Sequence, residues 1–267
     1  MISTFALHPA ASKYIIARAV CRLPEVQKAW EKGRIFIGHG TTNIAVAEQL
    51  LNLKIDQAER YVAGVISQRA ACATEAGLRH KPWCLEKGRI VDIDWLEFLN
   101  SFGPEDVFIK GANAIDPCGN AGILLGDAQG GTIGKSIGIL KARGIKLIVP
   151  AGLEKMIPSC PSAEAVMGRE KSSRLIGMKT GYISLSNATI ITELESLKIL
   201  LGIDAVQIAA GGVGGMEGAV VLAADCRDDE TAQALLKLVK QASRTSPGNI
   251  KRKLCRTCSD PCSLADN

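Results

Sequence analysis

Short apolar runs alternate with helix-compatible runs along most of the chain, and this alternation constrains the fold more than any other feature. The apolar runs read as strands that are buried on both faces, which is typical of a mainly parallel sheet covered by helices. The predicted strands are 34–38, 61–67, 106–110, 122–126, 145–150, 205–210 and 219–224. The pattern predicts an α/β protein with a Rossmann-like, mainly parallel sheet and helices on both faces.

Helix start and stop signals separate these strands. Thr192 and Glu195 form a Thr-x-x-Glu capping box, which predicts a helix that begins there and runs to Leu201. In the segment 12–30, Pro24 either breaks a helix or begins a second one. Further helices are predicted over 44–51, 93–102, 133–143 and 229–242, and Gly144 and Gly202 are placed to end the helices that reach residues 143 and 201.

The chain has 267 residues, a length that one α/β domain can fill with a single large core. The residues after Ser243, Arg-Thr-Ser-Pro-Gly-Asn, have the composition of a turn, and a basic stretch with three cysteines follows them. We therefore predict a single α/β domain over 1–245, opened by a helical segment, and a tail over 246–267.

Of the net charge of +5, the segment from Arg244 to residue 267 carries +3, so the rest of the chain is nearly balanced and gives no ground for a nucleic-acid partner. The most apolar long window, 205–224, contains five glycines and Glu217. Two strands around a glycine loop fit that window better than a membrane helix, and we predict no membrane contact.

Six of the nine cysteines are scattered along the body, and the first residues lack a basic start and an apolar core segment. These features predict reduced, mostly buried thiols in a cytoplasmic protein. Cys255, Cys258 and Cys262 cluster in the tail, one thiol short of the four ligands that zinc or an iron–sulfur cluster takes. Two alternatives stay open: a mobile tail with reactive thiols, which we favour, and a metal completed by a fourth ligand from elsewhere. No metal ligand is assigned.

A glycine- and threonine-rich turn joins the first predicted strand to the helix that follows it. It contains Gly38, Gly40, Thr41, Thr42 and Asn43. Glycine allows the backbone to approach a ligand, and the free N–H groups at a helix start attract anions. The turn therefore predicts a cradle for a phosphate or carboxylate, with an ordinary strand-to-helix turn as the alternative.

Two later glycine loops also follow predicted strands. Lys110 ends a strand and precedes Gly111 and Asn113, so its amine can bind an anion or take part in chemistry. The second loop supplies Gly130, Gly131, Thr132 and Lys135, although Gln129 stands where a phosphate loop for nucleotide triphosphates requires glycine. Because loops beyond strand ends meet at one edge of such a sheet, we expect all three to gather at one site.

Glu217 is the only charge in its apolar window. A carboxylate there is either a nucleophile or base, or a structural group bonded to neighbouring N–H groups. Lys110 and Glu217 are accordingly the catalytic candidates. The pair Glu154–Lys155, which also follows a strand, is expected to be an ordinary surface pair.

Taken in order, these loops resemble the superfamily of ribose-5-phosphate isomerases, CoA transferases and sugar-phosphate sensor domains. The motif 38–43 looks like their early phosphate-holding loop, and 110–117 looks like the isomerases' Asp-Gly-Ala-Asp-Glu segment. The latter is also similar to a loop of lactate-utilisation-type domains. The resemblance covers motifs from about Arg34 to Leu222, and this chain departs from the isomerases at Lys110 and Asn113, where they carry acids.

The resemblance implies a small anionic metabolite, phosphorylated or carboxylated, as the ligand. It implies isomerisation or acyl/CoA transfer if the protein is an enzyme. The alternative is a non-catalytic metabolite sensor or an interaction protein of the same fold. The sequence leaves the cofactor unknown and the assembly of several identical copies open.

Overall fold

A mixed sheet of six strands forms the centre of the molecule. The computed structural model describes residues 1–67 and 69–246, so the predicted tail beyond residue 246, with Cys255, Cys258 and Cys262, lies outside the described residues. The strand order is β12-β10-β7-β2-β5-β6. The strands are β12 (Thr189–Ile191), β10 (Lys146–Pro150), β7 (Val107–Ile109), β2 (Arg34–Ile37), β5 (Trp83–Glu86) and β6 (Arg89–Ile90).

Four of these strands run parallel. β2 pairs with β7, β7 with β10 and β10 with β12 in the same direction, whereas β5 pairs with both β2 and β6 in the antiparallel sense. The prediction of a mainly parallel sheet is confirmed for this part of the chain. The carboxyl ends of the four parallel strands consequently lie along one edge, where ligands bind in open sheets of this kind.

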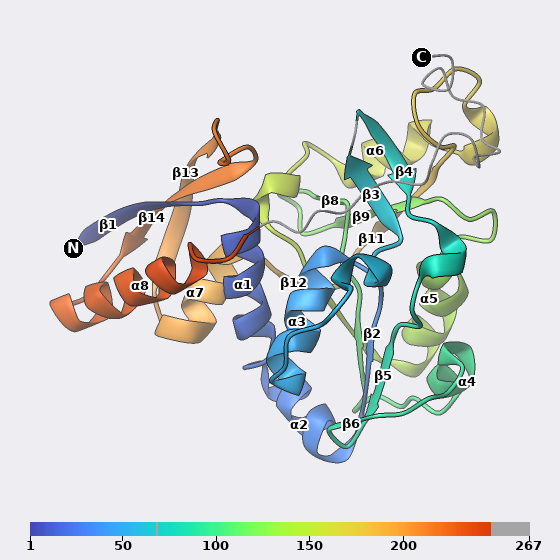
Figure 1. Ribbon diagram of the computed structural model, residues 1–267, viewed down its shortest axis with the longest axis horizontal. Helices are drawn as coiled ribbons and strands as arrows, with labels where there is room; N and C mark the ends of the chain where they lie inside the picture. Colours follow the sequence, from blue (N-terminus) through green and yellow to red (C-terminus); the bar gives the residue numbers. More distant parts are fainter. Residues whose placement is uncertain (68, 247–267) are drawn as a thin grey trace.

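Helices cover both faces of the sheet (Figure 1). Ile35 and Ile37 pack in one core cluster with residues of α1 (Pro9–Val20), α2 (Pro24–Lys32) and α3 (Thr41–Leu51). Phe36 points to the opposite face, where its ring stacks on Phe108 at 4.4 Å. Phe36 and Phe108 belong to a second core cluster, which also contains residues of α4 (Trp95–Asn100) and α5 (Gly131–Arg143). The alternation along β2 is what a strand buried on both faces requires.

Strands outside the central sheet pair in smaller antiparallel sheets, which join sequence neighbours in some cases and segments far apart in the chain in others. They are β1 (Ile2–Leu7), β14 (Ala219–Asp225) and β13 (Asp204–Gly211) in one sheet, β11 (Gly181–Leu185), β9 (Ala121–Leu125) and β8 (Ala114–Ile115) in a second, and β3 (Gly64–Ser67) with β4 (Ala70–Ala73) in a hairpin. The predicted mainly parallel sheet therefore does not include these strands. A short connection, as between β3 and β4, favours antiparallel pairing, and an apolar run is the same in either arrangement.

The amino-terminal helical segment predicted over 12–30 corresponds to α1 and α2, and the strand β1, which the sequence analysis did not predict, precedes it. β1 lies antiparallel to β14, with Ile2 opposite Asp225. α7 (Glu193–Leu201) and α8 (Asp229–Ala242) accompany this outer sheet on the left of Figure 1. Leu7 and Val220 belong to the same core cluster as Phe36, so the outer sheet shares one core with the central one.

Several helix boundaries follow the predicted signals closely. Pro24 begins a second helix, and the Thr192 capping box at the start of α7 is complete. Gly144 and Gly202 end α5 and α7 in the left-handed conformation, with φ of 66° and 68°. Glycine is favoured there because a Cβ strains positive φ.

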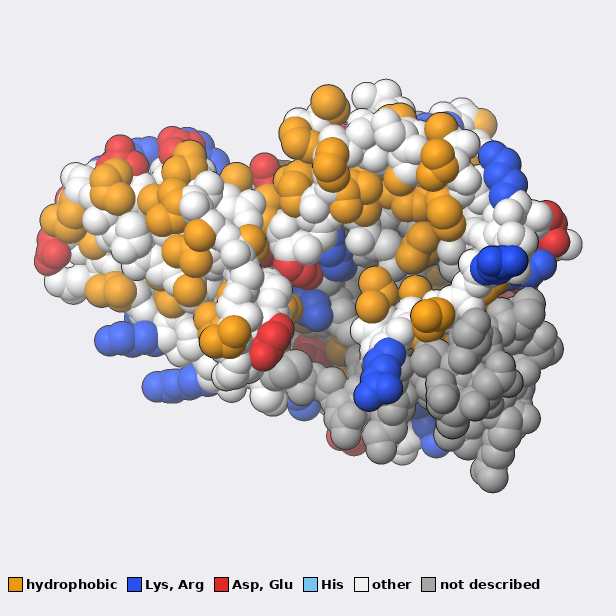
Figure 2. Space-filling view, turned by 90° about the horizontal axis from the view of Figure 1, so that it is seen from above, with side chains coloured by type: hydrophobic (Ala, Val, Ile, Leu, Met, Phe, Trp, Pro, Cys, Tyr) orange, Lys and Arg blue, Asp and Glu red, His pale blue; other side chains and the backbone are white. Residues whose placement is uncertain are grey.

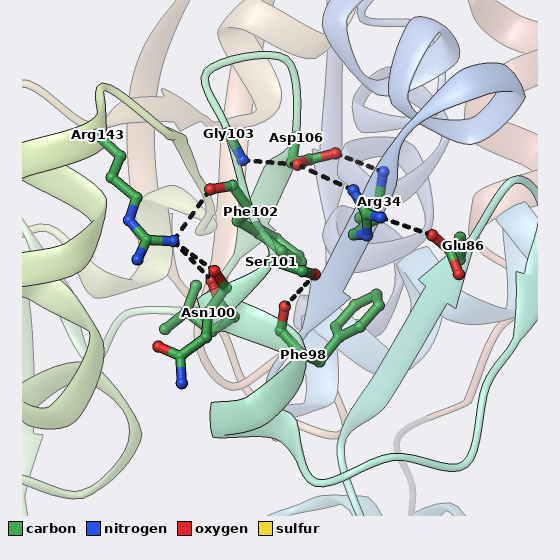
Figure 3. A network of polar contacts seen from close by, with 10 residues as sticks. Arg34, Glu86, Phe98, Asn100, Ser101, Phe102, Gly103, Asp106 and Arg143 are labelled. Atoms are coloured by element: carbon green, nitrogen blue, oxygen red, sulfur yellow. Dashed lines mark hydrogen bonds and ion pairs between the residues drawn. The ribbon is translucent and has the colours of Figure 1, made fainter.

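A polar network secures the end of the sheet opposite the strands' carboxyl ends (Figure 3). The buried carboxylate of Asp106 accepts from the backbone N–H of Arg34 at 2.7 Å and from that of Gly103 at 2.8 Å. The Arg34 guanidinium also pairs with Glu86 at 2.9 Å. This network fixes the starts of β2 and β7, and thereby the register of the strands that lead to the site.

The six described cysteines are free thiols, four of them buried, one half-buried and one exposed. Among residues 1–67 and 69–246, no helix combines the length and apolar character that a membrane span requires.

Candidate functional site

A cavity of about 1100 Å³ opens at the carboxyl ends of the parallel strands. Seen from above, the molecule is hollowed here, with basic and acidic side chains in the recess (Figure 2). Segments that follow β2, β7 and β10 form its floor, and the β3–β4 hairpin, the end of β9 and the start of α5 contribute walls. A cavity of this size accommodates a ligand larger than inorganic phosphate, up to about the size of a nucleotide.

Ten of the predicted site residues line this one cavity. They are Gly40, Thr41, Thr42, Lys110, Gly111, Asn113, Gly130, Gly131, Thr132 and Lys135. They come from three loops that are far apart in sequence, as the strand-end argument requires. The third loop reaches the cavity from β9, which belongs to a smaller antiparallel sheet, and not from a central strand.

Gly38 and Asn43 are not among the lining residues and support the floor from below. The Asn43 side chain is fully buried, and its Nδ2 donates to the Gly38 carbonyl at 2.8 Å. A Cβ at Gly38 would lie 3.1 Å from Cδ of Lys110, so glycine leaves room for the lysine stem. Both residues thus position the loop and Lys110.

The amino terminus of α3 faces the cavity with unused donors. Gly40 precedes the helix without a side-chain cap, and its own N–H donates to the Tyr61 carbonyl at 2.9 Å. Within the described part of the chain, the backbone N–H groups of Thr41, Thr42 and Asn43 have no protein acceptor. Three free N–H groups at a helix start form a site for an anion.

The amino terminus of α5 is occupied differently. Asp127 lies beside it and its Oδ1 accepts from the N–H of Gln129 at 2.8 Å and of Gly131 at 3.3 Å. These backbone hydrogen bonds lower the pKa of Asp127. Because a carboxylate already satisfies this helix start, a bound anion is favoured at α3 more than at α5.

Three half-buried lysines line the cavity, Lys13 from α1, Lys110 after β7 and Lys155 after β10. The Lys110 ammonium donates to the Gly111 carbonyl at 3.1 Å, and the Lys155 ammonium donates to the Ala112 carbonyl at 2.9 Å. Burial and the neighbouring Lys155 charge lower the pKa of Lys110 to about 8. Burial likewise lowers the pKa of Lys13 and of Lys155.

The expectation that Glu154 and Lys155 form a surface pair is wrong. Both belong to a short 3-10 helix, η3 (Leu153–Lys155), and both line the cavity. Lys13 and Arg79 also reach the lining from segments that gave no site signal. The cations of the lining are Lys13, Arg79, Lys110, Lys135 and Lys155, against the acids Asp127 and Glu154. The excess of positive charge favours an anionic ligand.

His39 closes the cavity near β2. Its Nε2 lies 2.8 Å from the His80 carbonyl, which places a proton on that nitrogen. Burial lowers the pKa of His39, and the nearby charges of Arg79 and Lys110 lower it further. His39 is therefore a neutral ring at physiological pH.

Glu217 lies in the β13–β14 hairpin and is not part of the cavity lining. Its exposed carboxylate accepts from the Gly215 N–H at 2.9 Å, and backbone hydrogen bonds lower its pKa. This is the structural alternative that the sequence left open. The two residues taken as catalytic candidates are therefore not brought together.

In residues 1–67 and 69–246, no three His, Cys, Asp or Glu side chains gather as metal ligands would. Comparison with protein-family models, curated proteins and solved structures finds no match to this chain. The function is accordingly argued from the cavity itself.

Proposed function

We propose that the protein binds a small anionic metabolite, phosphorylated or carboxylated, in the cavity at the carboxyl ends of the parallel strands. One observation carries the proposal: the free N–H groups of Thr41 and Thr42 at the start of α3 belong to the lining of the same cavity as Lys13, Lys110 and Lys155. The helix start would hold the anionic group, and the lysines would neutralise charge on the rest of the ligand.

The proposed enzymatic role is isomerisation or acyl/CoA transfer, in keeping with the resemblance of the loops. Lys110 is the supporting feature, since an amine with a pKa of about 8 is partly neutral near physiological pH. In its neutral form the amine can act as a base or nucleophile, and in its charged form it can stabilise an oxyanion. The Rossmann-like classification and the superfamily remain part of this proposal.

A non-catalytic metabolite sensor is the second candidate. The observation in its favour is the position of Glu217, which leaves the cavity without the carboxylate that a CoA transferase of this superfamily would use. A sensor would need only the cradle and the lysines.

A thermal-shift screen with sugar phosphates, CoA esters and small carboxylates tests the proposal, because a ligand of the folded state raises the melting temperature. We expect a hit with the wild type that Lys110→Met loses. Lys237→Met is the matched control, since Lys237 is exposed on α8, away from the cavity. No stabilisation by any of these anions would refute the proposal, and turnover of the hit separates enzyme from sensor.

A further inference from the structure

Two buried carboxyl oxygens without a hydrogen-bond donor lie behind the lysines. They are Oε2 of Glu154 and Oε1 of Glu193. A Cβ built at Gly152 would overlap the first and lie 3.0 Å from the second, so both oxygens lie on the same side of this glycine. Two carboxyl groups on the same side of one glycine repel each other when both are ionised, and a proton held between them relieves the repulsion and gives the oxygens a donor.

Glu193 is the more enclosed member of the pair. It is the first residue of α7, directly beyond β12, and its side chain has no exposed surface. Its other oxygen, Oε2, accepts from the Leu153 N–H at 2.9 Å. Burial, with a smaller contribution from the Glu154 charge, raises the pKa of Glu193 to about 7, against lowering by Ser12 and the backbone N–H groups.

Glu154 is the member that reaches the ligand space. Glu154 lines the cavity, and Glu193 does not. The charged groups that face the pair are Lys13 from α1 and Lys155 from η3, both of which feel the Glu154 charge. A proton on the pair therefore has a path to the cavity through Glu154, beside the ammonium groups that would hold an anion.

We propose that Glu154 and Glu193 share one proton and form the acid–base pair of the cavity, in which Glu154 exchanges that proton with the bound ligand. Glu193 is the positioning residue, because it acts through Glu154. The inference rests on the proposed function, since the exchange requires a ligand in the cavity. The transfer moves one proton between Glu154 and the ligand and needs no other reactant. Glu154 thus provides a carboxylate in the cavity, where the sequence has Asn113 in place of an acid and where Glu217 does not reach.

The test follows the glutamate side-chain carboxyl carbons of the full chain by ¹³C NMR through a pH titration. We expect one carboxyl signal to titrate near neutrality, and this titration to be absent in Glu193→Gln. The amide that this substitution introduces can donate to Glu154 Oε2, so the variant should fold. Glu154→Gln should move the remaining Glu193 titration toward lower pH, because it removes the like charge. Glu164→Gln on α6 (Cys160–Val166), an exposed position, should leave the near-neutral titration unchanged.

Inorganic phosphate is the probe for the link to the cavity. Bound phosphate adds negative charge near Glu154 and should raise the titration midpoint by about one pH unit. Titration of every glutamate below about pH 5 would overturn the shared proton, whatever binds. A near-neutral titration that persists while phosphate fails to bind would overturn the anion site and the exchange. Phosphate that binds without moving the midpoint would overturn the exchange alone.

Discussion

The ammonium groups of Lys110 and Lys155 donate to neighbouring carbonyls of one loop, those of Gly111 and Ala112. This arrangement brings two like charges together at the cavity floor, and burial removes part of the hydration of each ammonium group, which destabilises the folded state. Such a placement is typical of residues kept for a ligand, because folding alone would favour an apolar side chain.

Lys110→Met should therefore make the protein more stable and a poorer binder. The pKa of Lys110 is about 8 in the folded protein and 10.5 in the unfolded chain, so between these pH values the unfolded state binds more protons. At pH 7 the amine is charged in both states, and folding therefore costs the free energy of burying that charge. We expect a gain of about 1–2 kcal/mol at pH 7, after allowance for partial exposure, with a loss of anion affinity of about tenfold or more. Urea denaturation and calorimetric titration measure the two effects. A variant that is less stable at pH 7 would contradict the assignment.

Thr41→Pro should weaken anion binding while the helix remains intact. Proline is tolerated at the first helical position, and ψ of 150° at Gly40 suits a following proline. The change deletes one free N–H, so we expect a loss of about tenfold in affinity. Thr41→Ala is the control, since it removes the hydroxyl and keeps the N–H. Equal affinity in the proline and alanine variants would remove the backbone cradle from the site.

Glu193→Gln should change how stability depends on pH. The folded protein keeps a proton on Glu193 up to about pH 7, whereas the unfolded chain releases it near 4.5. The folded state thus binds more protons across this window, so wild-type stability should fall as the pH rises from 4.5 to 7, by about 2–3 kcal/mol. Urea titrations at pH 5 and pH 7.5 should show that fall in the wild type and a much smaller one in the variant.

Gly152→Ala should disturb the carboxyl pair without unfolding the protein. The new Cβ would overlap Oε2 of Glu154, the end of a flexible side chain, and φ of −73° at Gly152 suits alanine. We expect a destabilisation of about 1 kcal/mol and the loss of the near-neutral carboxyl titration. Gly138→Ala in α5, where nothing lies within 4 Å of the new Cβ, should be neutral or stabilising. A titration that survives Gly152→Ala would place the carboxyl groups differently.

Glu217→Gln should leave the affinity for the best screened ligand unchanged. The residue lies in the β13–β14 hairpin, outside the cavity lining. Calorimetric titration beside the wild type measures the effect, and a loss of affinity of about tenfold or more, the size of one lost hydrogen bond, would return Glu217 to the site.

The sequence by itself determined the local elements and the edge of the sheet where the site lies. The Thr192 capping box, the helix stops at Gly144 and Gly202, and Pro24 act through their own backbone neighbours, so their effects can be read from the chain. The loops at Gly40, Lys110 and Gly130 could be assigned to one site because each follows a strand.

Only the tertiary structure decided how the strands pair and which charges meet. An apolar strand is equally suited to parallel and antiparallel neighbours, so the separate sheet of β1, β14 and β13 left no mark in the pattern. Lys13, Glu154 and Glu193 come from segments far apart in sequence, and no motif joins them. Their burial depends on the packing of α1, η3 and the start of α7 around one cavity. Because of that packing, Glu154 has a buried carboxyl oxygen without a hydrogen-bond donor, and the pKa of Lys155 is lowered.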